Sequence, residues 1–179
     1  SSYYWECRLA AGVTQVDFLA CVAASDGGRE ILVEQGMGAG LPDVPFANPL
    51  GDQTHDFFRQ WAEPTSVLYE AIPLIWLEFD QVEGSLPEVP LPSFSFCLDP
   101  LYADRRSWSQ HITAINLQER HKVAERGLRL LFGRALPARR RQTLCACFDS
   151  LPVGGRIIHI SAMVARHAAV VKVYGSVPQ

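Results

Sequence analysis

Three short apolar segments of strand length recur along the chain, and they limit its possible folds more than any other pattern. They lie at 15–22, 74–82 and 156–165. Each is rich in β-branched or aromatic residues and alternates, at least in part, between apolar and polar side chains. A period of two is typical of a β-strand that buries one face. We therefore expect a fold built around a sheet.

Each of these strands is expected to have a partner that follows it along the chain, which predicts three β-hairpins. Asp26-Gly27 is a strong turn signal, because a type I′ turn needs positive φ at both central residues. The segment 29–35 is then the expected return strand of the first hairpin. The segments 93–98 and 170–177 are expected to be the return strands of the second and third hairpins.

The segments between the hairpins carry apolar residues at helical spacing. Helices are expected at 53–62, 65–72, 107–132 and 138–148, a loop at 36–51 and a further strand at 3–9. Hairpins that lie side by side form an antiparallel sheet, and its apolar face needs cover, so the expected fold class is α+β. We expect a single domain over 1–179: a mostly antiparallel sheet of three β-hairpin units, covered on one face by helices. A curved half-barrel is one form that such a sheet can take.

The composition agrees with one ordinary globular domain. The chain has 179 residues, of which 48% are hydrophobic and 20% are charged, close to the averages for folded domains. The formal net charge is -3, which disfavours a general nucleic-acid-binding protein, since these are usually basic. The apolar stretches have strand length only, so we expect no membrane span.

The five cysteines indicate the cellular compartment. Their number is odd and most have apolar neighbours, which is typical of free thiols in a reducing environment. We therefore expect a cytoplasmic protein. Because the chain begins at Ser1 and not at methionine, we also expect a tag remnant or an earlier segment before it.

The best candidate for chemistry is a pair of carboxylates on the second strong strand. Glu78 and Asp80 alternate along 74–82, so both lie on one face, which they share with Trp76. Paired carboxylates act as acid and base when their environments differ. The alternative is a solvated sheet face, since polar residues on one side are ordinary in antiparallel strands.

A second candidate cluster comes from the last hairpin. His159 and Ser161 share one face of the first strand, and Lys172 and Tyr174 share one face of the return strand. If both faces point into a cupped interior, these groups would bind an anionic ligand or move protons. If they face water, they belong to an unremarkable edge hairpin.

Other motifs are weak. Cys145 and Cys147 are expected on a helix, where two residues correspond to about 200° of rotation, so their thiols diverge. Neither cysteine has a further pair at zinc-site spacing, so no metal site is expected. A cysteine nucleophile would need a histidine brought near by folding, which the sequence does not show. No cofactor motif is present, so we expect no cofactor.

Two functions remain open. The first is an accessory or binding domain of a bacterial biosynthetic pathway that recognises a peptide, a protein or a second copy of itself through hairpin edges. The second is a small biosynthetic enzyme with a pocket on the cupped sheet face. Its catalytic residues would be Glu78 and Asp80 with His159 or Tyr174, and its ligand-binding residues would be Trp76, Ser161 and Lys172. Because no motif specifies a reaction, binding is the preferred interpretation.

Overall fold

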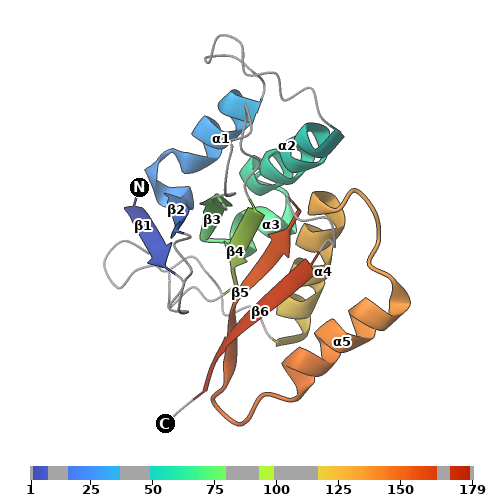
Figure 1. Cartoon of the computed structure of the whole chain (residues 1–179). Helices are drawn as coiled ribbons and strands as arrows, with labels where there is room; N and C mark the ends of the chain where they lie inside the picture. Colours follow the sequence, from blue (N-terminus) through green and yellow to red (C-terminus); the bar gives the residue numbers. More distant parts are fainter. Residues whose placement is uncertain are drawn as a thin grey trace.

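The computed structural model describes residues 2–7, 16–36, 49–79, 93–98, 117–164 and 170–177. Within these ranges the strands form one open antiparallel sheet of six strands in the order β1-β2-β3-β4-β5-β6 (Figure 1). The strands are β1 (Ser2–Cys7), β2 (Val16–Ala23), β3 (Leu74–Phe79), β4 (Ser93–Cys97), β5 (Arg156–Met163) and β6 (Val170–Ser176). The expected α+β class with a mostly antiparallel sheet is therefore confirmed.

The helices lie between the strand pairs along the chain. They are α1 (Gly28–Gly36), α2 (Pro49–Ala62), α3 (Val67–Ala71), α4 (Leu117–Leu131) and α5 (Ala138–Asp149), with a short 3-10 turn η1 (Ala24–Asp26) before α1. The helices expected at 53–62 and 138–148 are confirmed. The expected helix at 107–132 is confirmed from 117 onward, and its earlier part lies outside the described residues, as do 37–48 of the expected loop.

The prediction of a first hairpin with a return strand at 29–35 is wrong, because this segment is helix α1. Gly27 does have the positive φ of 69° that the turn signal indicated. Its carbonyl, however, accepts a hydrogen bond from the Ile31 amide at 3.1 Å, which is the first bond of a helix. Strand β2 pairs instead with β1 and β3.

Close packing explains why glycine occupies position 28, where helix α1 begins. A Cβ at this position would lie 2.4 Å from both the carbonyl oxygen of Ala23 and a methyl of Val22. The following residue, Arg29, is buried and its guanidinium lies 3.6 Å from the ring centre of Tyr69 and 5.4 Å from that of Trp61. Burial lowers the pKa of Arg29 below its ordinary value, and Tyr69 partly offsets this effect.

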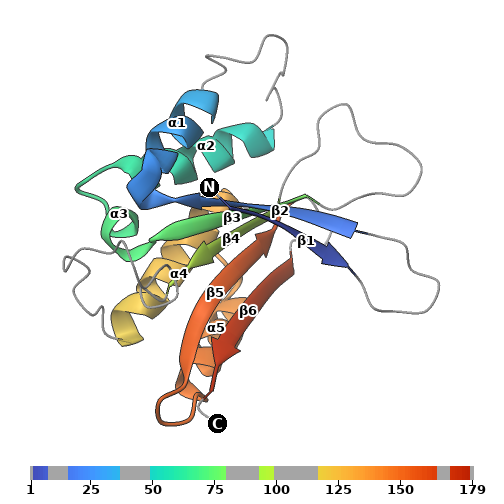
Figure 2. The same cartoon turned by 90° about the vertical axis from the view of Figure 1, so that its left-hand side faces the viewer.

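The sheet is open, with β1 and β6 at its edges. It twists strongly, so that β2 and β6 run in clearly different directions in the side view (Figure 2). The predicted set of three hairpins and the curved half-barrel are not confirmed. What the structure has is six neighbouring antiparallel strands, interrupted along the chain by the helical segments.

The hydrophobic core lies between one face of the sheet and the helices. Phe94 and Phe96 of β4 contact the rings of Phe58 and Phe57 of α2 at 5.6 and 5.7 Å between centroids. Helix α4 also passes so close to Phe96 that a Cβ at Gly127 would lie 2.9 Å from its ring. The same face of β5 adds further apolar residues to this core.

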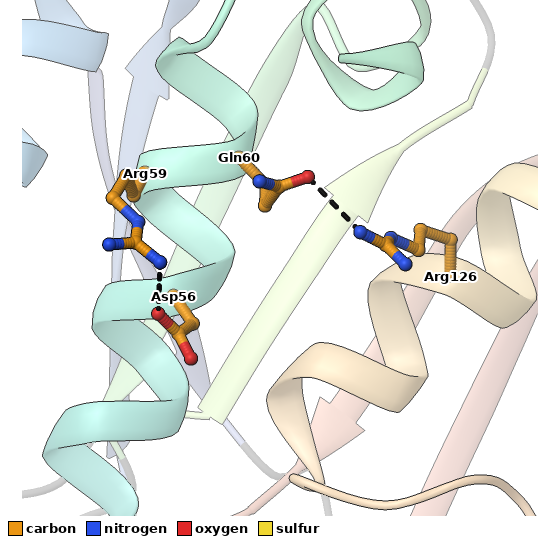
Figure 3. Close-up of polar contacts among 4 residues, drawn as sticks. All are labelled: Asp56, Arg59, Gln60 and Arg126. Carbon is orange, nitrogen blue, oxygen red and sulfur yellow. Dashed lines mark hydrogen bonds and ion pairs between the residues drawn. The ribbon is translucent and has the colours of Figure 1, made fainter.

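Polar contacts also join residues of the helical layer. Arg126 of α4 donates a hydrogen bond of 3.2 Å to the side-chain carbonyl of Gln60 on α2 (Figure 3). Arg59 pairs with Asp56 one turn earlier on α2 at 3.0 Å, and both side chains are more than half exposed. None of the helices in the described ranges is long and apolar enough to cross a membrane.

Candidate functional site

The candidate site lies on the face of the sheet opposite the described helices, which we call the helix-free face. Strand register decides which residues share it. Trp76 lies opposite Ser95, Ser95 opposite Ser161, and Ser161 opposite Lys172, so four strands contribute one row. The adjoining row contains Glu78 and Ser93. The residues that were predicted to share a face within β3, within β5 and within β6 therefore all lie on one face of the whole sheet.

The central contact of this face is an ion pair between strands that are not neighbours. Lys172 Nζ on β6 lies 3.5 Å from Glu78 Oε1 on β3. The Glu78 side chain is only 6% exposed, whereas that of Lys172 is 35% exposed. The two strands between them carry the short side chains Ser95 and Ser161 at the facing positions. These small residues leave the space that the two long side chains cross.

Two buried hydroxyls lie beside this ion pair. Ser93 and Ser161 are 0% and 1% exposed, and within the described ranges neither Oγ has a hydrogen-bond partner. Leaving a buried hydroxyl without a partner typically costs about 1–3 kcal/mol. Native proteins hold few such groups, and each calls for an explanation, such as an ordered water, an ion or a functional role. The helix-free face thus contains hydrogen-bonding capacity that the described protein atoms do not use.

His159 and Tyr174 form a separate group on the same face. They are opposite each other in the β5–β6 register, and their rings meet edge to face with centroids 6.4 Å apart. Tyr174 is 43% exposed, so this group is open to solvent. His159 lies opposite Cys97, whereas Glu78 lies opposite Ser93. Four residues along a strand correspond to about 13 Å, so the register separates His159 from Glu78.

The remaining predicted site residues divide into two cases. Trp76 lies on the predicted face and packs against a small cluster of Cys21, Leu74 and Cys97. This places its ring over the sheet and not beside the core. Asp80, the second carboxylate of the predicted pair, lies outside the described residues. The predicted Glu78–Asp80 pairing thus stays a prediction, and Lys172 is a charged partner of Glu78 in the structure.

Sequence reasoning missed Ser93 and Ser95. The alternation of Phe94 and Phe96 with these serines was visible, and it placed the serines on the face opposite the core. Nothing in the sequence indicated that this second face would be buried as well. In the described part of the chain, no group of three or more His, Cys, Asp and Glu side chains is arranged to hold a metal ion.

Comparison with known proteins adds no assignment. No protein-family model, no curated protein and no solved structure matches this chain. Any function must therefore be argued from the site itself.

Proposed function

We propose that this chain is a binding domain that recognises a peptide, or a molecule with peptide-like groups, on the helix-free face of its sheet. The observation that carries the proposal is the pair of buried, unpartnered hydroxyls of Ser93 and Ser161 beside the Glu78–Lys172 ion pair. A serine hydroxyl both donates and accepts, as does an amide group, so the two are complementary.

The charges of the site support the same ligand class. Glu78 and Lys172 are held at 3.5 Å, which is long for a hydrogen bond between charged groups. A ligand with an ammonium and a carboxylate group would form a shorter contact with each of them. The exposed side chains of Lys172 and Tyr174 mark the side from which such a ligand would approach.

The edge position of β6 adds a second support. Among the described strands β6 pairs with β5 alone, and an extended peptide can add to such an edge through its backbone. Val170 and Tyr174 of β6 are 40% and 43% exposed, which offers apolar contact beside the polar groups. A second copy of the chain would use the same edge, so self-recognition is one outcome of the test.

The alternative is an enzyme that moves protons with Glu78 and His159. The offset of about 13 Å along the strands, set by their register, favours binding over that alternative. An acid and a base that act on one small substrate must both come within hydrogen-bond reach of it.

The first experiment is native mass spectrometry of the purified protein beside its denatured mass. A bound mass in the range of a short peptide supports the proposal, and a dimer points to self-recognition at β6. A library of tripeptides, with free and with blocked ends, is then screened by thermal shift. Wild type, Ser161→Ala and Lys172→Met are compared, with the exposed Thr143→Ala on α5 as the matched control.

The expected result is a tripeptide that raises the unfolding temperature of wild type and of Thr143→Ala but not of Ser161→Ala. Blocked ends should weaken the shift in wild type and have little further effect in Lys172→Met. A monomer that carries no bound mass and responds to no tripeptide would overturn the proposal.

A further inference from the structure

A cysteine and a histidine meet on the helical layer, away from the helix-free face. The Sγ atom of Cys145 on α5 lies 3.0 Å from Nε2 of His121 on α4. The ring of Phe148 packs edge to face against the imidazole with centroids 5.7 Å apart, which fixes the orientation of His121. Folding thus brings together two residues that are 24 positions apart in the sequence.

This contact opens into a cavity of about 630 Å³. The cavity is bounded by His121, Lys122, Cys145, Phe148 and Asp149, and by the turn at 151–155. The thiol is partly exposed, as is the imidazole. A small molecule that enters the cavity therefore meets sulfur and imidazole together, with a cation and a carboxylate at the rim.

We propose that Cys145 is a nucleophilic thiol, activated by His121, and that it forms mixed disulfides with small disulfides that enter this cavity. A thiolate is the reactive form of cysteine, and an adjacent imidazole produces it by accepting the thiol proton. This requires the His121 tautomer that carries its proton on Nδ1, so that Nε2 accepts.

The reaction balances without any further reagent. The thiol proton passes from Cys145 to Nε2 of His121, and the thiolate attacks one sulfur of the disulfide RS–SR. A new Cys145–S–S–R bond forms as the old S–S bond breaks. The departing RS⁻ takes the proton back from the imidazolium and leaves as RSH, so Cys145 is oxidised while the released sulfur is reduced.

Cys147 lies on the same helix but does not share this environment. It lines a different cavity, of about 550 Å³, together with Leu128, Leu144 and Val171. Two residues on a helix differ by about 200°, so its thiol points away from Cys145 and cannot displace the bound group. The mixed disulfide at Cys145 should therefore persist, which makes this position a modification site and makes Cys147 its internal control.

The test is mass mapping of each cysteine after brief exposure of the native protein to iodoacetamide or to hydroxyethyl disulfide. We expect Cys145 to react at least about tenfold faster than Cys147, which is also half-buried but has no histidine contact within the described ranges. Hydroxyethyl disulfide should add one adduct at Cys145 and no internal bond between Cys145 and Cys147.

Variants at His121 separate activation from structure. In His121→Gln and His121→Ala the rate at Cys145 should fall to that of Cys147, while the rate at Cys147 in the same sample stays unchanged and reports an intact fold. Added imidazole should restore the rate in His121→Ala, which a purely structural role would not allow. Equal rates at Cys145 and Cys147 in wild type, or a Cys145 rate that is insensitive to His121, would overturn the proposal.

Discussion

Lys172 and Glu78 are 94 positions apart in the sequence, yet Nζ of the first lies 3.5 Å from Oε1 of the second, across two intervening strands. The contact depends on the small serines beneath it and on the order of the sheet. It joins the edge strand β6 to the centre of the helix-free face. For this reason it is both a structural link and the charged centre of the proposed binding site.

Breaking this ion pair from one side should destabilise the protein. Lys172→Met removes one cation from the buried Glu78 carboxylate, and we expect a loss of about 1–3 kcal/mol in the free energy of unfolding, below the value for fully buried pairs because Lys172 is partly exposed. The double variant Glu78→Gln/Lys172→Met should recover much of this loss. Urea denaturation of the two single variants and the double variant gives the coupling energy.

The exposed pair Asp56–Arg59 is the matched control for the Glu78 and Lys172 variants. Because both side chains are more than half exposed, Arg59→Ala should change stability by no more than about 0.5 kcal/mol. A Lys172→Met effect as small as this control would contradict a stabilising role of the Glu78–Lys172 contact.

Replacing a buried serine of the helix-free face by alanine should stabilise the protein. Ser161→Ala removes a hydroxyl that has no hydrogen-bond partner in the described part of the chain, so we expect the unliganded protein to gain about 1 kcal/mol in the free energy of unfolding. The same variant should bind peptide less well, because residues of binding sites often lower stability while they serve function. As a control, Ser150→Ala at an exposed helix end should show no gain of stability in thermal or urea denaturation. A loss of stability in Ser161→Ala would contradict the prediction that its hydroxyl is unused.

Gly127 should not tolerate alanine, although alanine is the better helix former. At an exposed helix position, replacing Gly by Ala raises the free energy of unfolding by about 1 kcal/mol. The reverse change Ala146→Gly, on the exposed side of α5, should therefore lower it by about the same amount. At Gly127 the new methyl would lie 2.9 Å from the fully buried Phe96 ring. We expect a net loss of about 1–2 kcal/mol from overpacking, measured by thermal and urea denaturation.

Arg29 should resist replacement by lysine. Its planar guanidinium stacks on Tyr69 and donates a hydrogen bond to the Tyr69 carbonyl, and an ammonium cannot reproduce both contacts. We expect Arg29→Lys to cost about 1–2 kcal/mol, whereas Arg134→Lys at an exposed position should cost almost nothing.

The Arg29 effect should also be independent of pH near neutrality. Burial lowers the pKa of Arg29, so the protonated form is less favourable in the folded chain than in the unfolded chain. The sign means that this cost would be relieved only in strongly alkaline solution, where the folded state loses its proton first. Arginine stays protonated in both states at ordinary pH, and unfolding curves at about pH 6 and about pH 8 should therefore show the same contribution from Arg29.

The sequence by itself determined the fold class and most of the elements. Period-two alternation identified β3, β4, β5 and β6, and helical spacing identified α2 and α5, because these patterns depend only on which side of an element is apolar. The same alternation placed Trp76 with Glu78, and His159 with Ser161, on shared faces. These inferences needed no knowledge of distant parts of the chain.

Only the tertiary structure decided the rest. The Asp26-Gly27 signal indicated a turn, but the next segment is helix α1, which packs Gly28 against Ala23 and stacks Arg29 on Tyr69. The partner of Glu78 depends on strand order and register, and the contact between His121 and Cys145 depends on how two helices pack. Local patterns determine which face of an element is polar, whereas long-range packing determines which polar groups meet.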